Sequence, residues 1–303
     1  MAESRALLVM AYGTAGDLDD VERYYTDIRR GNPPPRDLLE ELAGRYRAIG
    51  GRSPLYDITR RQAAGIEKRL VGVKAYIGQK HSPPFIADAV ADMATDGLEV
   101  AAGLVLAPHY SKMSIGDYEG RAREAAARCG WPGELRIIQS WHLEPGYVRW
   151  LAVRVRAAVG QLSEVARPSA TVVFTAHSLP ERIVAQGDPY ADQLAETAAA
   201  VAEEASIARY RTGWQSAGRT QEKWLGPDLL EILDQLAAAG VRGVVVCPCG
   251  FVSDHLEVLY DVDIEAQERA QKLGLELRRT PSPNDDPEFL DLLATVAERA
   301  LYR

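Results

Sequence analysis

Histidine and carboxylate side chains are the groups in this sequence whose placement best suits proton transfer or metal handling. His177 directly follows a β-branched apolar run, and His255, Leu256 and Glu257 open a helical pattern further along the chain. Imidazole and carboxylate together accept protons and bind divalent transition metals. We therefore interpret His177 and Glu257 as a candidate catalytic pair. The alternative is that each of these residues has only a structural role.

Three carboxylates, Glu257, Asp261 and Glu265, are spaced at i, i+4 and i+8. On an α-helix this spacing places them along one stripe. Such a row of oxygen ligands would pass a hydrated divalent cation inward, and repulsion between the carboxylates would raise the pKa of some of them. A solvated acidic helix face explains the same spacing. The sequence leaves both interpretations open.

Arginine gathers near the N-terminus, at Arg29, Arg30 and Arg45, with Tyr46 and Ser53 close behind. Guanidinium groups pair bidentately with carboxylate or phosphate. In a chain whose net charge is -8, this local concentration favours an anionic small-molecule substrate. Surface ion pairs with neighbouring acidic residues are an equally good explanation for any single arginine.

Short apolar runs alternate with longer helical patterns, which is typical of βαβ units and parallel sheets. We predict an α/β protein with two Rossmann-like domains, each a four-stranded parallel sheet flanked by helices, and a cleft between them. Residues 1–145 and 146–285 are the predicted domains, and a final helix at 286–303 could pack back on the first. The predicted strands are 6–11, 73–77, 100–107, 135–140, 171–176, 208–214, 243–247 and 275–279.

Helical patterns beginning at proline lie between the strands, at 35–49, 83–96, 189–205 and 227–239, and another closes the chain at 287–301. Proline is suited to the first turn of a helix. The candidate site residues follow predicted strands. In open α/β sheets, ligands bind outside the carboxyl ends of the strands, so we expect the site there.

Composition excludes several classes of protein. The 303 residues are 47% hydrophobic and 26% charged, as in ordinary globular domains, and the acidic balance disfavours nucleic acid as a partner. No apolar run approaches the ~18 residues of a membrane span, and no signal peptide or dinucleotide-binding glycine motif is evident. The three cysteines, Cys129, Cys247 and Cys249, suit a reducing compartment. We expect a cytoplasmic monomer without a membrane anchor.

Nine blocks of the sequence resemble those of the ferrochelatase family, in the same order and from about residue 7 to the C-terminus. The HSLP and DHLEVLYD blocks are specific to that family. The nine blocks are LLVMAYGT (7–14), ERYYTDIRRG (22–31), RYRAIGGRSPL (45–55), KAYIGQKH (74–81), APHYS (107–111), AHSLPER (176–182), GWQSAG (213–218), WLGPD (224–228) and GFVSDHLEVLYD (250–261).

The resemblance implies insertion of Fe²⁺ into a porphyrin held between two Rossmann-like domains. It assigns catalysis to His177 and Glu257, leaving open which of the two takes the pyrrole protons. It also implies a metal-binding row formed by His177, Glu257, Asp261 and Glu265. The porphyrin-binding residues that it implies are Tyr12, Thr14, Arg29, Arg30, Arg45, Tyr46, Ser53, Tyr118 and Trp224.

The segment 17–37 is charged, where family members that act at a membrane carry an apolar lip. With Tyr12 this makes the chain most similar to the soluble bacterial members that use coproporphyrin III and form coproheme III. The alternatives are a protoporphyrin IX ferrochelatase, a cobalt chelatase of the same fold, and a tetrapyrrole or haem carrier without catalytic activity.

The resemblance also bears on cofactors and partners. Some relatives bind a [2Fe–2S] cluster through four cysteines, but this chain has only three. We therefore expect no iron–sulfur cluster and no required cofactor, with Fe²⁺ and the porphyrin as substrates. A downstream haem-synthesis enzyme is a possible partner.

Overall fold

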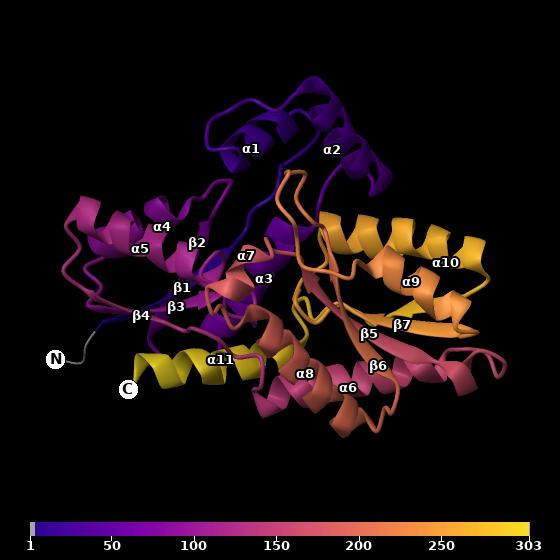
Figure 1. Cartoon of the computed structure of the whole chain (residues 1–303). Coiled ribbons are helices and arrows are strands. Elements are labelled where there is room, and N and C mark those ends of the chain that lie inside the picture. The colour runs from indigo at the N-terminus through magenta and orange to yellow at the C-terminus, as the bar shows by residue number, and fades with distance from the viewer. Residues whose placement is uncertain (1–3, 303) are drawn as a thin grey trace.

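Two four-stranded parallel sheets form the framework of the computed structural model, which describes residues 4–302 (Figure 1). All eight predicted strands are present. The first sheet has the order β2 (Val73–Gln79), β1 (Arg5–Ala11), β3 (Val100–Val105) and β4 (Glu134–Ile137). The second has the order β6 (Tyr210–Gln215), β5 (Thr171–His177), β7 (Gly243–Cys247) and β8 (Glu276–Arg279).

The two sheets have the same strand order, so β1 corresponds to β5 and β3 to β7. Neighbouring central strands run parallel and in register, for example Val9 beside Leu104 and Phe174 beside Cys247. The order reverses between these central strands, which is where a parallel sheet opens a crevice for a ligand. The loops that follow β1, β3, β5 and β7 are therefore the ones positioned to form a site.

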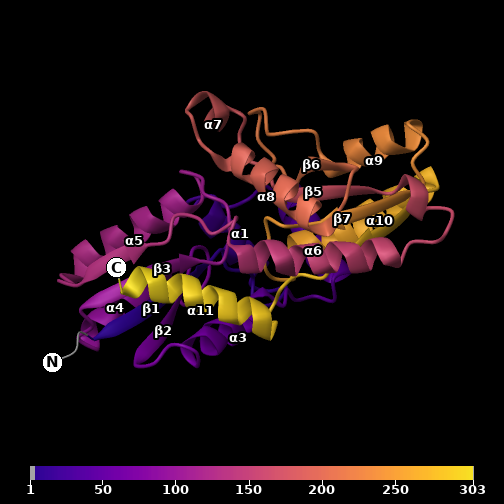
Figure 2. The ribbon, with the colours of Figure 1, turned by 90° about the horizontal axis from the view of Figure 1, so that it is seen from below.

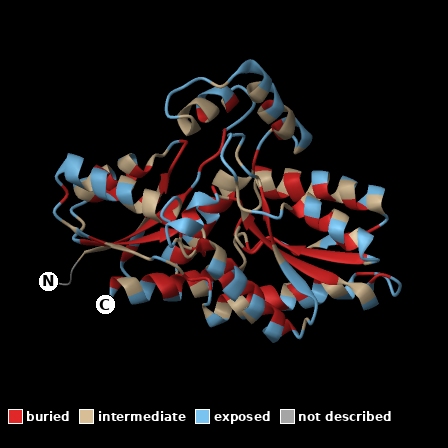
Figure 3. Ribbon diagram, in the orientation of Figure 1, coloured by how far each residue is buried: buried red, intermediate tan, exposed pale blue. Residues whose placement is uncertain are grey.

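Helices cover both faces of each sheet, as buried parallel sheets require. The sheets themselves are buried along most of their length (Figure 3). Around the first sheet the helices are α3 (Leu55–Glu67), α4 (Ile86–Thr95), α5 (Ile115–Cys129) and α11 (Pro287–Leu301). Around the second they are α6 (Pro145–Gly160), α7 (Arg182–Ala185), α8 (Tyr190–Ala205), α9 (Leu229–Ala238) and α10 (Gln267–Leu273), with the 3₁₀ turn η1 (Arg167–Ser169) and the π-helix η2 (Val258–Ala266).

Several predicted boundaries are wrong by a few residues. Strand β3 ends at Val105, two residues early, because Pro108 has no amide hydrogen to continue a ladder. Four helices start one to three residues after the proline that was expected to open them. Pro35 and Pro189 stand at the N-cap, and Asp228 instead of Pro227 caps α9 by accepting the amide hydrogen of Leu230.

The largest apolar core runs through both halves of the chain. It includes Leu7 of β1, Phe174 of β5 and Phe289 of α11, with the ring centroids of Trp141 and Phe289 5.9 Å apart. Helix α11 contacts β3 and β4 as well as α6, and the two helices lie beside each other in the view from below (Figure 2). The division at residues 145 and 285 stays a prediction, because the two halves share this core.

Helices α1 (Val21–Ile28) and α2 (Arg36–Ala48) form a small lobe that projects from the first half (Figure 1). Val21, Tyr24 and Tyr46 form its core, and Leu256 from the second half completes it. The lobe is therefore packed against the loop that precedes η2. Within residues 4–302, no helix combines the length and apolar character needed to cross a lipid bilayer.

Candidate active site

One cavity of about 330 Å³ lies where the carboxyl ends of the two sheets face each other. Its walls come from the loops after β1, β3, β5 and β7 and from the α1–α2 lobe. Of the predicted site residues, eight line it: Tyr12, Thr14, Tyr46, Ser53, Tyr118, His177, Trp224 and Glu257. The chain thus brings together residues that are more than 200 positions apart.

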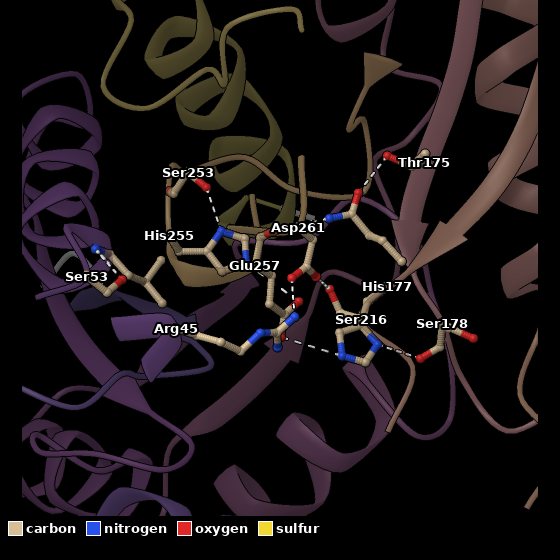
Figure 4. Close-up of polar contacts among 12 residues, drawn as sticks. Arg45, Ser53, Thr175, His177, Ser178, Ser216, Ser253, His255, Glu257 and Asp261 are labelled. Carbon is tan, nitrogen blue, oxygen red and sulfur yellow. Dashed lines mark hydrogen bonds and ion pairs between the residues drawn. The ribbon is translucent and has the colours of Figure 1, made fainter. Parts of the chain in front are cut away.

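Glu257 lies between two imidazole rings (Figure 4). Its Oε1 atom is 3.6 Å from Nε2 of His177, and its Oε2 atom is 3.7 Å from Nε2 of His255. Nδ1 of His177 bonds the carbonyl of Ser178, and Nδ1 of His255 bonds the carbonyl of Ser253. A carbonyl can only accept, so both Nδ1 atoms carry hydrogen and both Nε2 atoms are left for the cavity.

Glu257, His177 and His255 form a trio in which the pKa values of Glu257 and His255 shift in opposite directions. Burial raises the pKa of Glu257, but the charges of His177, His255 and Arg45 outweigh burial and lower it to about 2. Burial lowers the pKa of His255, but the hydrogen bond and charge of Glu257 outweigh burial and the net shift is upward. Glu257 therefore stays ionised at neutral pH, and its charge favours the protonated form of His255.

A close backbone approach holds the trio in place. Gly250, in the loop after β7, donates its amide hydrogen to the carbonyl of Thr175 in β5. A Cβ atom at Gly250 would lie 2.5 Å from Cβ of Ala176, so only glycine fits. This contact places the 250–257 loop directly over the end of the strand that carries His177.

The predicted acidic row does not continue along a cavity wall. The helix that carries it is a π-helix, whose wider turn differs from the α-helix that the spacing assumed. Asp261 is buried and accepts hydrogen bonds from Arg45 and Ser216, whereas Glu265 is exposed; neither lines the cavity. Burial raises the pKa of Asp261 to about 6, although Arg45 opposes the rise. Among residues 4–302, no group of three or more His, Cys, Asp and Glu is arranged to hold a metal ion.

The predicted arginines also lie outside the cavity wall. Arg45 pairs with Asp261 and lies 4.6 Å from the ring centroid of Tyr260. Arg29 donates from Nε to the carbonyl of Asn32, and Arg30 is exposed on the same lobe with a left-handed backbone. Arg45 and Asp261, which the sequence assigned to opposite ligands, thus meet each other at the junction of the lobe and the second half.

Two residues of the cavity wall, Lys80 and His255, were absent from the predicted site. Lys80 lies in the KAYIGQKH block, and its Nζ atom is 2.6 Å from Asp117 and 4.8 Å from the ring centroid of Tyr118. Burial lowers its pKa, against the opposing effect of Asp117. The signal for Lys80 was its place just after a strand, and the signal for His255 was its place two residues before Glu257.

The remaining predicted residues form the aromatic and hydroxyl part of the wall. The hydroxyl of Tyr46 lies 2.8 Å from Thr14 Oγ1 and accepts the amide hydrogen of Ala15. Trp224 lies beside His177, with ring centroids 6.4 Å apart and the ring planes tilted by 51°. The cysteines are not in the wall: Cys247 and Cys249 are buried, Cys129 is exposed, and none is in a disulfide.

This architecture is the two-domain chelatase fold. Sirohydrochlorin chelatase SirB from Bacillus subtilis subspecies spizizenii, solved in complex with cobalt, has a similar fold at a TM-score of 0.60. The comparison covers 98% of this chain and 95% of that one, and the two sequences are 10% identical. At that identity the likeness concerns the fold alone.

The sequence narrows the class to one family: the family model Ferrochelatase matches residues 4–301, and the chain belongs to that family. The coproporphyrin III ferrochelatase of Anoxybacillus flavithermus is 49% identical, over 96% of this chain and 94% of that protein. The coproporphyrin III ferrochelatase of Bacillus subtilis is 46% identical, over 98% of each chain. The family resemblance inferred from the nine blocks is confirmed.

Proposed function

We propose that this protein inserts Fe²⁺ into coproporphyrin III and releases coproheme III. The observation that carries the proposal is Glu257 held between the Nε2 atoms of His177 and His255 in the wall of a cavity between two sheets. Sequence identity of 46–49% to coproporphyrin III ferrochelatases over nearly the whole chain supports the choice of substrate.

The reaction exchanges two pyrrole N–H protons for one Fe²⁺ ion, so the site must remove two protons as the metal enters. An ionised carboxylate attracts the cation, and neutral imidazole nitrogen accepts protons. Because Glu257 has a pKa of about 2, it is a poor proton acceptor. We therefore assign the protons to the Nε2 atoms of the imidazoles, chiefly His177, and assign Glu257 to holding the resulting imidazolium and the incoming iron.

The roles of the outer residues follow from their charge. Asp261 and Glu265, beyond Glu257 on η2, would guide the hydrated cation, with Arg45 leaving Asp261 when a ligand arrives. Arg29, Arg30 and Arg45 would receive propionates, together with Ser53 and Tyr46 at the wall. Tyr12, Thr14, Tyr118 and Trp224 would contact the ring itself.

Iron is a substrate in this scheme, and metal-for-proton exchange needs no resident cofactor. We propose that the protein works in the cytoplasm as a monomer and passes its product to a later enzyme of haem synthesis. Free thiols at all three cysteines support a reducing compartment.

The decisive experiment compares anaerobic iron insertion into coproporphyrin III and protoporphyrin IX at equal concentrations. We expect kcat/KM to be higher for coproporphyrin III and His177→Ala to bind porphyrin but lose most turnover. A preference for protoporphyrin IX would overturn the substrate assignment, and a preference for Co²⁺ over Fe²⁺ would favour a cobalt chelatase. Tight porphyrin binding without turnover of any metal would indicate a carrier.

A further inference from the structure

Tyr12 and His177 occupy equivalent places in the two halves of the chain. Each comes at the carboxyl end of the strand that is first in sequence in its sheet, β1 or β5, and each lines the cavity. A flat ring that filled this cavity would have Tyr12 on the side opposite to His177 and Glu257, because these residues come from different sheets. The orientation of the Tyr12 phenol determines which contacts that side of the bound ring makes with the protein.

Tyr12 is the least buried tyrosine of the cavity wall. Its relative exposure is 40%, whereas Tyr24, Tyr46, Tyr118 and Tyr190 are all at or below 8%. The other four rings are fixed by the core around them. Tyr12 must be fixed by a small number of specific neighbours, because an exposed aromatic side chain otherwise changes rotamer readily.

His81 is the aromatic neighbour of that ring, and Nζ of Lys80 lies 5.8 Å from its centroid on the cavity wall. Its imidazole lies 4.7 Å from the Tyr12 ring between centroids, at an interplanar angle of 60°, and its amide hydrogen bonds the Tyr12 carbonyl at 3.0 Å. His81 is itself buried and does not line the cavity. It therefore acts on a bound ring through its neighbours, of which Tyr12 lines the cavity.

Asp27 fixes His81 in turn. Oδ1 of Asp27, on α1, lies 2.7 Å from Nδ1 of His81. An ionised carboxylate can only accept, so Nδ1 carries the hydrogen and the ring plane is set by this bond. A hydrogen bond to a charged group is stronger than a neutral one. The same bond ties the α1–α2 lobe to the end of β2, 54 residues away in sequence.

We propose that Asp27 and His81 are positioning residues that hold the Tyr12 phenol against the porphyrin ring during metal insertion. The proposal rests on the function proposed above and extends it, because it links the lobe over the cavity to the geometry of one side of the ring. Loss of the Asp27–His81 pair should have little effect on porphyrin binding through the propionates at the edge of the porphyrin ring. Loss of the pair should therefore lower kcat more than it raises KM.

A double-mutant cycle tests this coupling. Purified full-length protein is assayed as the wild type, Asp27→Ala, Tyr12→Phe and the double variant, with Fe²⁺ and coproporphyrin III. We expect Asp27→Ala alone to lower kcat about tenfold with KM within twofold. In the Tyr12→Phe background the same change should cost less than twofold, because the hydroxyl that it positions is already gone.

Three further variants serve as controls for this experiment. Glu22→Ala removes an exposed carboxylate from the same helix and should leave kcat unchanged. Asp27→Asn keeps a neutral acceptor for His81 and should recover part of the activity. His81→Asn should reproduce the Asp27→Ala loss and its dependence on Tyr12, and it serves as the test if Asp27→Ala does not fold.

Two outcomes overturn the proposal: unchanged kcat in Asp27→Ala, or an equal loss with and without the Tyr12 hydroxyl. The second would mean that Asp27 supports the lobe generally. If the wild type itself shows no iron insertion into coproporphyrin III, the proposed function fails instead, and the two failures are distinguished by that first measurement.

Discussion

Replacing Glu257 by glutamine tests whether one carboxylate organises both imidazoles. The pKa of Glu257 is lowered from 4.5 to about 2 by its partners, chiefly His177, His255 and Arg45 after the cost of burial is met. At about 1.4 kcal/mol per pKa unit, that shift corresponds to about 3 kcal/mol of favourable interaction in the charged form. If that interaction is needed when an imidazole becomes protonated, Glu257→Gln should lower kcat about 100-fold.

Glu257→Gln should also change the pKa of His255, which an activity assay does not measure. Without the carboxylate, burial dominates at His255, so the pKa of its imidazole should fall below the ordinary value of 6.5. NMR titration can resolve this, because the chain has only five histidines and His255→Gln assigns the signal. The control is Glu268→Gln, an exposed carboxylate in the first turn of α10. Near-normal turnover, or a His255 titration that does not move, would refute the reasoning.

Two other predictions concern stability and cavity shape. Burial lowers the pKa of His109 to about 3, so below pH 6.5 the unfolded chain takes up a proton that the folded protein does not. The free energy of unfolding should therefore fall by about 2 kcal/mol between pH 6.5 and 5.0, measured with urea, and His109→Gln should remove that loss; equal slopes in both proteins would contradict this. A Cβ atom at Gly218 would lie 2.3 Å from the indole of Trp224, so Gly218→Ala should displace this wall residue and raise KM for porphyrin several-fold. Gly120→Ala, with open space at its Cβ, is the control, and an unchanged KM and Trp emission in Gly218→Ala would exclude the effect.

The sheet framework was predictable because the central strands are short apolar runs that alternate with longer helical patterns in the sequence. His177 could be placed on the same basis, since it directly follows the buried run 171–176 and the ends of parallel strands meet at one edge. Seven of the eight predicted residues in the cavity wall belong to the family blocks, and the eighth, Tyr118, lies in the first turn of α5.

The rest depended on contacts between segments far apart in the chain. The π-helix at 258–266 carries no sequence pattern that distinguishes it from an α-helix, so the predicted stripe of carboxylates used the wrong period. The pairing of Arg45 with Asp261 joins residues 216 positions apart and was invisible to local reasoning. Lys80 was missed because a lysine next to a strand is usually a surface residue, and only the fold buries it beside Asp117.

The pairing of Arg45 with Asp261 changes how the charge of the protein is distributed. Arg219, in the loop after β6, pairs in a similar way with Glu41 on α2, so two ion pairs join the lobe to the second half. Cations and anions that the sequence suggested for separate ligands thus neutralise each other where the halves meet. A ligand with a single carboxylate gains little by displacing Asp261 from Arg45, because one ion pair replaces another. On the proposed function, a porphyrin with four carboxylates would replace Asp261 at Arg45 while its other carboxylates meet Arg29, Arg30 and Ser53. Because the displaced Asp261 is then free for a cation, anion binding and metal entry should be linked through this one pair.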